Sequence, residues 1–387
     1  MKDVFIVAAK RTPVGGFLGS LSGFTATQLG KTAIEAIMNE VKLPTDKVEA
    51  VYMGNVLSAN LGQSPARQAA VFAGIPVDAD ATTVNKVCAS GLKAVITAAQ
   101  QVQFGVNSVV LAGGMESMSN VPHYIDGRKS TKLGHTQVTD GLLKDGLTDV
   151  YNGFHMGNAA EICAREYKLT REEQDDYALK SYKRAEDAFN ASKFNGEIIP
   201  IEVNGNIINR DEDIFKLIPE KIAKLKPVFE EGGTITAANA SNLNDGAAAL
   251  LLVSEEVVKE YNLKPLAKIK GYADAAQAPE WFTTSPSVAI PKALQQAGLT
   301  KEDIDYYEIN EAYAAVILAN AKLLDLDVEK INVYGGGVAM GHPIGASGAR
   351  IVVTLLSVLK QEGGKYGVAA ICNGGGGASA LVIENLQ

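Results

Sequence analysis

Residues 87–93 read Val87-Cys88-Ala89-Ser90-Gly91-Leu92-Lys93, and they lie between a short β-branched segment and an apolar helical pattern. The segment before them, 81–84, favours a strand, and 93–101 favours a buried helix. Cys88 is therefore predicted at a strand-to-helix junction, where free backbone N–H groups and the helix dipole favour a thiolate. This setting indicates a nucleophile. The alternative is a small buried side chain, which is what most free cysteines are.

The composition is that of an ordinary globular protein, large enough for two or three domains or for one duplicated fold. The 387 residues are 47% hydrophobic and 21% charged, with a net charge of −8. This balance argues against a nucleic-acid partner and against an anionic membrane surface. Three cysteines do not form a disulfide framework and indicate a reducing compartment. We expect a cytoplasmic protein without a signal or transit peptide and without a membrane span.

Two parts of the chain repeat one order of patterns. In the first part, a helix at 26–41 and a strand ending at Asn55 precede the Cys88 junction. In the second part, a helix at 288–296 and a strand ending at Asn310 precede Gly345-Ala346-Ser347-Gly348, which corresponds to Cys88-Ala89-Ser90-Gly91. A further buried strand then runs into glycines in each part, at 108–114 and at 367–372. Three elements in the same order and at nearly the same spacing indicate an internal duplication.

Each half therefore predicts a βαβαβ unit, and ligands of such sheets gather beyond the carboxyl ends of the strands. We expect Cys88, Asn310, His342 and Cys372 at those ends. Residues 119–250 match neither repeat and predict an inserted loop domain over the site, which gives domains at 1–118, 119–250 and 251–387. The middle of the insert is basic, with Lys216, Lys221, Lys224 and Lys226. It is either a solvated face of mixed charge or a patch that faces phosphate.

Two further residues have the chemistry of partners for Cys88. His342 is fixed between Gly341 and Pro343 just before a helix, where it is either a structural histidine or a base and oxyanion donor. Cys372 precedes four consecutive glycines, which are tolerable mainly where backbone N–H groups must reach a ligand. The two thiols could form a disulfide, but a nucleophile with a proton-transfer thiol fits a reducing compartment better. Cys163 is predicted to be core, and neither a metal-ligand spacing nor a nucleotide loop is present.

Taken together, a set of motifs in this order resembles the thiolase family over essentially the whole chain. The motifs are Asn85-Lys86-Val87-Cys88-Ala89-Ser90-Gly91, Gly113-Gly114-Met115-Glu116-Ser117-Met118, Asn239-Ala240-Ser241, Asn244-Asp245-Gly246, Asn310-Glu311-Ala312, Gly341-His342-Pro343-Ile344-Gly345 and Cys372-Asn373-Gly374-Gly375-Gly376. Within the family, they look like the acetoacetyl-CoA thiolase branch (acetyl-CoA C-acetyltransferase). The resemblance implies an α/β thiolase fold, with two duplicated βαβαβαββ halves packed as five α-β-α-β-α layers and an inserted loop domain.

The same resemblance implies a ping-pong Claisen condensation of two acetyl-CoA molecules to acetoacetyl-CoA plus CoA, and the reverse thiolysis. Cys88 would carry the acetyl group, His342 would help to activate its thiol, and Cys372 would shuttle the proton and then remove the α-proton of the second acetyl-CoA. One oxyanion hole would combine His342 with a water held by Asn310. The other would use the backbone N–H groups of Cys88 and Gly374, and such donors are each worth about 3 kcal/mol.

The resemblance also implies contacts with CoA and with the acyl group. They would come from Leu147, His155, Met156, Ala237, Ser241, Ala312 and Tyr313. The family usually has Phe where this chain has Tyr313, so a hydroxyl here either finds a partner or narrows and polarises the acyl pocket. No cofactor is expected to be required. A potassium site would involve Tyr182, Ala237, Ala238, Ala240 and Val338.

Two other functions remain open at this level: a 3-ketoacyl-CoA thiolase of broader chain length, and a non-catalytic thiolase-fold protein that binds acyl-CoA or lipid. A condensing enzyme of the ketoacyl synthase type would be expected to lack Cys372. We expect a homo-oligomer, a tetramer or otherwise a dimer, with acetyl-CoA, acetoacetyl-CoA and CoA as further partners and neither nucleic acid nor membrane. Residues 120–140 loosely resemble a tetramer-forming loop.

Overall fold

The structure is a computed structural model that describes residues 2–128 and 133–387. Its centre is a ten-stranded sheet with the order β4-β3-β5-β10-β1-β11-β14-β13-β12, and β2 (Gly15–Gly16) pairs with β10 beside this path. The N-terminal half contributes β1 (Val4–Arg11), β3 (Ala50–Gly54), β4 (Asp80–Val84), β5 (Val109–Ser117) and β10 (Asn244–Ser254). The C-terminal half contributes β11 (Ala267–Ala276), β12 (Tyr306–Ile309), β13 (Tyr366–Asn373) and β14 (Gly377–Asn385). The halves join where β1 meets β11 through two residue pairs, Phe5 with Lys268 and Ile6 with Ala267.

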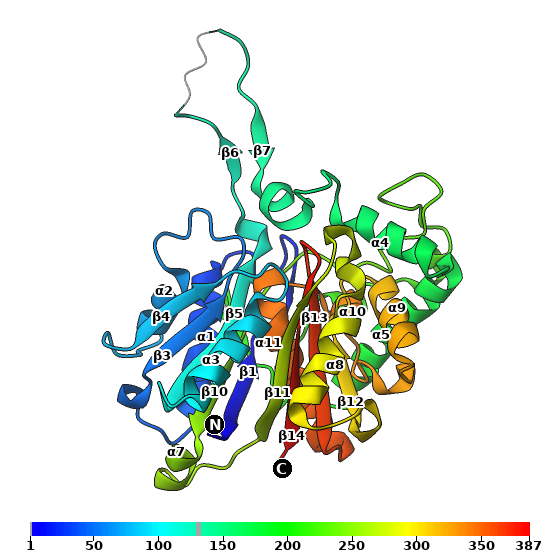
Figure 1. The fold of residues 1–387 in the computed structure, drawn as a ribbon. Coiled ribbons are helices and arrows are strands. Elements are labelled where there is room, and N and C mark those ends of the chain that lie inside the picture. The colour runs from blue at the N-terminus through cyan, green and yellow to red at the C-terminus, as the bar shows by residue number, and fades with distance from the viewer. Residues whose placement is uncertain (1, 129–132) are drawn as a thin grey trace.

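Helices cover both half-sheets and fill the space between them (Figure 1). The central helices are α3 (Ser90–Gln103) and α11 (Ile344–Glu362), and their apolar side chains form one core with strands of both halves. The outer helices are α1 (Ala26–Glu40) and α2 (Pro65–Phe72) on the N-terminal half and α8 (Pro286–Ala297) and α9 (Ala314–Leu324) on the C-terminal half. The predicted five-layered, duplicated α/β fold is confirmed.

Glycines let the two central helices approach each other closely. A Cβ atom on Gly91 of α3 would lie 2.7 Å from the backbone nitrogen of Ala349 on α11, and a Cβ atom on Gly348 of α11 would overlap the backbone of Leu92. By length and composition α11 could also cross a membrane, but 83% of its most apolar window is buried inside the protein, as in a core helix.

The insertion begins after β5. It contains the hairpin of β6 (His123–Ile125) and β7 (Val138–Asp140), then α4 (Met156–Glu166), α5 (Arg171–Asn190), the hairpin of β8 (Ile201–Val203) and β9 (Asn206–Ile208), and α6 (Pro219–Ile222). The β6–β7 hairpin projects away from the body in Figure 1. Residues 129–132, between the two strands in sequence, lie outside the described residues. The sheet resumes with the fully buried β10, so the predicted boundary at residue 250 falls inside a strand that lies between β1 and β5.

The second half differs from the first at its outer edge. In the first half β4 is a complete strand, whereas its counterpart in the second half is a single parallel bridge between Ile331 and Tyr307 of β12. Asn332 takes the place of the missing strand. Its backbone N–H donates to Tyr307 O at 2.9 Å, and its side chain accepts from the Ile309 N–H at 2.9 Å and donates to Ile309 O at 2.8 Å.

Candidate active site

The four predicted catalytic side chains lie where sheet strands meet loops and helix starts. Cys88 precedes α3, Asn310 follows β12, His342 precedes α11, and Cys372 lies near the end of β13. They come from both halves of the duplication. One region therefore combines a thiol from the first half with a thiol, an imidazole and an amide from the second.

A tight turn presents Cys88. Val87 has a φ of +47°, and the Ser90 N–H donates to Val87 O at 3.0 Å. The Ser90 hydroxyl donates to the same oxygen at 2.6 Å, and it accepts from the Lys86 N–H at 2.8 Å. A left-handed conformation costs a β-branched residue roughly 1–2 kcal/mol, so these bonds and the packing around the turn must hold it.

The environment of Cys88 keeps its sulfur protonated at rest. Burial raises the pKa of the Cys88 thiol from 9.0 to about 11, and the charge of Glu116 adds to this. The backbone N–H groups of Gly374 and of Cys88 itself act in the opposite direction. Burial thus acts against the expected preference of the helix N-terminus for a thiolate, and α3 begins only at Ser90, two residues after Cys88. A base must take the proton.

His342 has the form of such a base. Burial, with the charge of Arg350 as a second cause, lowers the pKa of His342 to about 3, so the imidazole is neutral. Nδ1 lies 2.6 Å from Ser347 Oγ, whose hydroxyl donates to Pro343 O at 2.9 Å. We therefore assign the ring proton to Nδ1. Nε2 is left as an acceptor, and it has no hydrogen-bond partner among the described residues.

Cys372 and Asn310 are more deeply buried than Cys88 and His342. Cys372 is fully buried, and burial together with the charge of Cys88 raises the pKa of its thiol well above the ordinary value. Cys372 lies two residues before Gly374, whose backbone N–H interacts with the Cys88 sulfur. The Asn310 side chain is also fully buried, and neither its oxygen nor its nitrogen has a partner among the described residues. A buried amide with both groups free is suited to hold a small polar molecule.

A cavity of about 440 Å³ opens onto this group, and Cys88, His342 and Gly374 line it. All seven residues predicted to contact substrate line it too: Leu147, His155, Met156, Ala237, Ser241, Ala312 and Tyr313. Cys372 and Asn310 are not among the lining residues. Cys372 instead packs in one apolar cluster with Met156, Ala312 and Tyr313, directly behind the wall.

The sequence did not point to several residues that shape this cavity. Phe229 stacks on His155 with ring centroids 4.7 Å apart and meets Tyr313 edge to face at 6.2 Å. Phe229 lies in an irregular segment, so no periodic pattern could have identified it. Glu116 lies in one of the motifs that resemble the thiolase family, but the sequence assigns it no function. Its carboxylate accepts from the Val56 N–H at 3.0 Å and the Gly345 N–H at 2.9 Å, and it thereby ties the two halves together next to Ile344, which lines the cavity.

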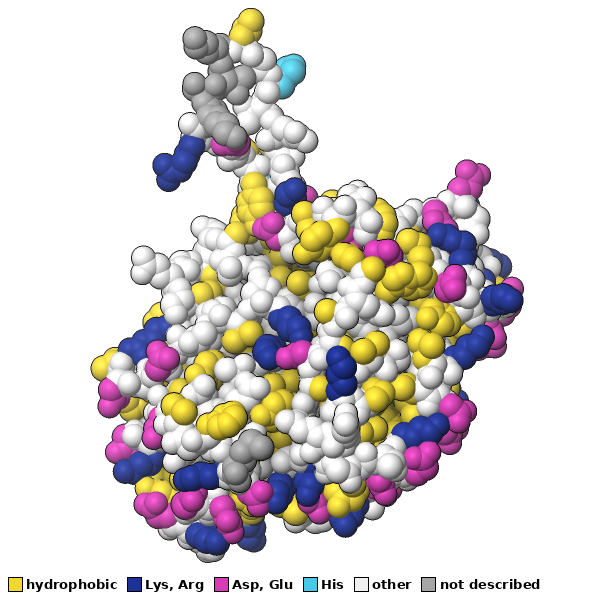
Figure 2. Space-filling view, viewed as in Figure 1, with side chains coloured by type: hydrophobic (Ala, Val, Ile, Leu, Met, Phe, Trp, Pro, Cys, Tyr) yellow, Lys and Arg dark blue, Asp and Glu magenta, His cyan; other side chains and the backbone are white. Residues whose placement is uncertain are grey.

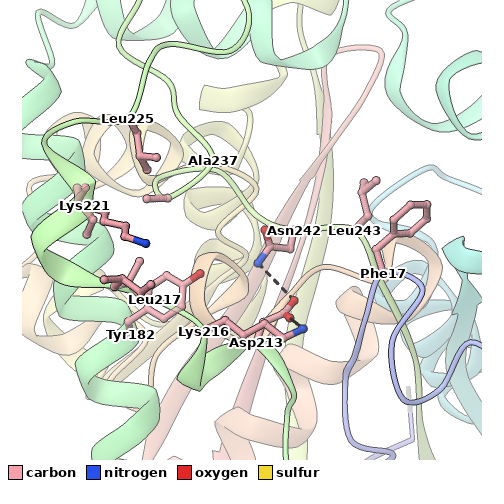
Figure 3. A pocket seen from close by; sticks show the side chains of 13 residues that line it. Phe17, Tyr182, Asp213, Lys216, Leu217, Lys221, Leu225, Ala237, Asn242 and Leu243 are labelled. Carbon is pink, nitrogen blue, oxygen red and sulfur yellow. Dashed lines mark hydrogen bonds and ion pairs between the residues drawn. The ribbon is translucent and has the colours of Figure 1, made fainter.

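A second cavity, of about 510 Å³, adjoins the first (Figure 3). Tyr182, Ala237 and Ala238 of the predicted potassium site line it, whereas Ala240 lines the first cavity and Val338 lines neither. Lys221 extends into the space, and Lys216 turns to Asp213, with which it forms an ion pair at 2.8 Å. Across the described residues, no group of three or more His, Cys, Asp or Glu side chains could hold a metal ion.

Comparison with known proteins identifies the family of the chain. The family model described as "Thiolase, N-terminal domain" matches residues 4–256, and "Thiolase, C-terminal domain" matches residues 263–385. An Arabidopsis thaliana relative named "Acetyl-CoA acetyltransferase 1" is 57% identical over 99% of this chain and 94% of its own length. A Gibberella zeae relative named "Acetyl-CoA acetyltransferase ERG10, cytosolic" is 54% identical over 100% of this chain and 99% of its own. A Bos taurus relative named "Acetyl-CoA acetyltransferase, mitochondrial" is 52% identical over 100% and 92%.

Solved structures show the same fold. The Acat5 thiolase from Ascaris suum in complex with coenzyme A superimposes with a TM-score of 0.96 at 47% identity, and the match covers 100% of both chains. Human mitochondrial 3-ketoacyl-CoA thiolase gives a TM-score of 0.97 at 41% identity, covering 100% of this chain and 99% of that one. Both the sequence and the fold match over their whole length. The chain therefore belongs to the thiolase family.

Proposed function

We propose that this protein is an acetyl-CoA C-acetyltransferase, which condenses two acetyl-CoA molecules to acetoacetyl-CoA plus CoA and catalyses the reverse thiolysis. One observation carries the proposal: a thiol within reach of two backbone N–H donors shares a cavity with a neutral histidine, and a second thiol lies directly behind it. The three relatives described above, 52–57% identical, carry the name acetyl-CoA acetyltransferase.

In the first half-reaction, Cys88 takes an acetyl group from acetyl-CoA. His342 Nε2 accepts the Cys88 proton, and the sulfur attacks the thioester carbonyl. The N–H groups of Cys88 and Gly374 donate to the oxyanion. Collapse breaks the bond between the carbonyl carbon and the CoA sulfur, and the proton on His342 reaches that sulfur directly or through Cys372. The products are acetyl-Cys88 and CoA.

In the second half-reaction, Cys372 acts as the base. Its proton passes to His342, and the Cys372 thiolate removes an α-proton from a second acetyl-CoA. Its raised pKa makes that thiolate strongly basic. His342 and a water held by Asn310 stabilise the enolate oxygen. The enolate carbon attacks acetyl-Cys88, the new C–C bond forms, and the departing Cys88 sulfur takes the proton from His342.

Acetyl transfer to the enzyme tests the proposal. Incubation with radiolabelled acetyl-CoA is expected to label the wild type and Cys163→Ala, because Cys163 is a core thiol, and to leave Cys88→Ser unlabelled. Cys372→Ser should accept the label and fail to form acetoacetyl-CoA. Labelling of Cys88→Ser to the wild-type level would refute the assigned nucleophile.

A broader 3-ketoacyl-CoA thiolase is the second candidate, and the likeness to the human 3-ketoacyl-CoA thiolase favours it. The ratio of kcat/KM for C4 and C10 3-ketoacyl-CoA in thiolysis separates the two. We expect C4 to be preferred, and a preference for C10 would replace our assignment.

Three further properties belong to this proposal. The phenol oxygen of Tyr182 and carbonyl oxygens of Ala237, Ala238, Ala240 and Val338 are hard donors that suit K⁺, and replacing K⁺ by Na⁺ should raise the KM for CoA.

A homotetramer, or otherwise a dimer, is expected in light scattering. Free thiols favour the cytosol, as in the name of the fungal relative, while the bovine relative is named mitochondrial. Fractionation of the source cells distinguishes the two compartments.

A further inference from the structure

The turn that carries Cys88 is also held by Lys86, a side chain without a part in the chemistry above. Lys86 Nζ lies 2.5 Å from Asp274 Oδ1, 2.9 Å from Ser379 Oγ and 3.1 Å from Ala378 O. An ammonium group has three N–H donors, so all three are used and the side chain is fixed in place. Lys86 thus starts at the nucleophile turn in the first half and ends on strands of the second half.

The receiving strands carry the second thiol. Ala378 lies on β14, directly opposite Cys372 on β13 in the antiparallel pairing. The neighbouring Ser379 hydroxyl donates to Asp274 Oδ1 at 2.6 Å, which orients the carboxylate on β11 toward Lys86. The Lys86 side chain therefore connects the turn of Cys88 to the hairpin of Cys372.

The turn needs such an anchor. Val87, between Lys86 and Cys88, has a φ of +47°, and a β-branched residue keeps a left-handed conformation only where its surroundings impose it. If Lys86 is released, the turn can relax toward an ordinary conformation. Cys88 would then move relative to the Gly374 N–H and to Cys372.

We propose that Lys86 is a positioning residue that sets the separation of the Cys88 and Cys372 sulfur atoms. The proposal rests on the proposed function, because that function gives both thiols their roles. Lys86 acts through the turn and does not touch the reacting atoms.

The chain offers a matched control in Lys93. Its Nζ lies 2.6 Å from Asp274 Oδ2, and its side chain is 30% exposed against 24% for Lys86. Lys93 is on α3, beyond the turn. Lys86→Met and Lys93→Met therefore each remove one ammonium group from the same carboxylate, and only Lys86→Met frees the turn.

Kinetics of acetoacetyl-CoA thiolysis provide the first readout. We expect Lys86→Met to lower kcat by about tenfold to a hundredfold, the order that small misplacements of reacting groups cause. The KM for CoA should stay close to the wild-type value, because the other cavity walls are unchanged. Lys93→Met should keep the wild-type kcat. Equal losses in both variants, or no loss in Lys86→Met, would overturn the proposal.

The second readout does not depend on turnover. Phenylarsine oxide bridges two neighbouring thiols, so it should inactivate the wild type and Lys93→Met at one rate and Lys86→Met several-fold more slowly. Equal rates in all three would contradict the proposal. A wild type without thiolase turnover would refute the proposed function and leave this measurement valid.

Lys86→Arg serves if Lys86→Met does not fold, as judged by circular dichroism. The planar guanidinium cannot place its donors on the same three acceptors, so both readouts should change in the same direction by a smaller factor. Wild-type values in a folded Lys86→Arg protein would overturn the proposal.

Discussion

The imidazole of His342 is neutral and buried, and its burial makes the folded protein less stable at acidic pH. Its pKa is about 3 in the folded protein against 6.5 in an exposed chain. Between these values the unfolded chain binds one more proton than the folded protein, so the stability contributed by this group is lost as pH falls from about 6.5 toward 3. The slope reaches up to about 1.4 kcal/mol per pH unit.

His342→Gln removes this titration. Urea unfolding at pH 6.5, 5.5 and 4.5, at one protein concentration, should show a steeper loss of unfolding free energy in the wild type than in the variant. Parallel curves for the two proteins would mean that the imidazole is charged in the folded state.

Tyr313 places a hydroxyl where the acyl chain is expected. It lines the catalytic cavity, burial and then the charges of Cys88 and Cys372 raise its pKa, and Oη has no hydrogen-bond partner among the described residues. A longer alkyl chain would remove this hydroxyl from water without replacing the bond, at about 1–3 kcal/mol. Tyr313→Phe should therefore raise kcat/KM for C6 relative to C4 3-ketoacyl-CoA by about tenfold.

Tyr334→Phe is the control for this change. Tyr334 Oη donates to Glu362 at 2.6 Å, and Tyr334 does not line the catalytic cavity. Because Tyr334 does not contact substrate, the C6 to C4 ratio of Tyr334→Phe should equal that of the wild type. An unchanged ratio in Tyr313→Phe would remove Tyr313 from the determinants of chain length.

At the scale of elements, the crossing of α3 and α11 sets the position of Cys88 relative to His342, because each residue lies two positions before the start of one of these helices. Gly348→Ala would drive a methyl group into the Leu92 backbone and separate the helices. We expect a loss of about 1–3 kcal/mol in unfolding free energy, with reduced kcat.

Gly23→Ala tests whether the effect is specific, because a Cβ atom on Gly23 meets no heavy atom within 4 Å. Chemical unfolding of this variant should match the wild type within about 0.5 kcal/mol. Equal stability of Gly348→Ala and the wild type would mean that the helices can separate freely.

Much of the fold could be predicted because local patterns and packing agree. The apolar run at 367–372 is the buried β13, and Thr170 and Glu173, which have the spacing of a capping box, form one at the start of α5. Cys88, His342 and Cys372 were identifiable because glycine and proline mark their turns. The protonation state of the Cys88 thiol at rest could not be predicted, because the desolvation of the thiol depends on tertiary burial. The absence of a full strand at Ile331 could not be predicted either. Asn332 replaces that strand with side-chain hydrogen bonds, which leave no periodic pattern in the sequence.

At the scale of the whole molecule, the β6–β7 hairpin extends from the body with apolar side chains in water. Ile125, Leu133 and Val138 are 59%, 96% and 53% exposed. On the face shown in Figure 2, hydrophobic side chains are frequent over the middle and charged ones gather along the lower and right-hand rims. Exposed apolar groups of this kind mark protein contacts.

Replacing Ile125, Leu133 and Val138 by serine should therefore lower the mass of the proposed tetramer to that of a dimer in light scattering, and leave kcat unchanged. Ile207→Ser provides the comparison, because Ile207 is 60% exposed on the other small hairpin, β8–β9. The same mass for the triple variant and the wild type would exclude the hairpin from the tetramer contact.

The two edges of the sheet differ, and this difference limits how copies of the protein can pair with one another by strand addition. On the outer side of β12, Asn332 already uses the backbone groups of Tyr307 and Ile309, whereas β4 has no strand partner on its outer side among the described residues. A sheet with two free sides could recruit copies without limit and grow into a fibre. With only the β4 edge free, two molecules that pair through β4 leave no free edge for a third. Growth by strand addition therefore stops at the pair.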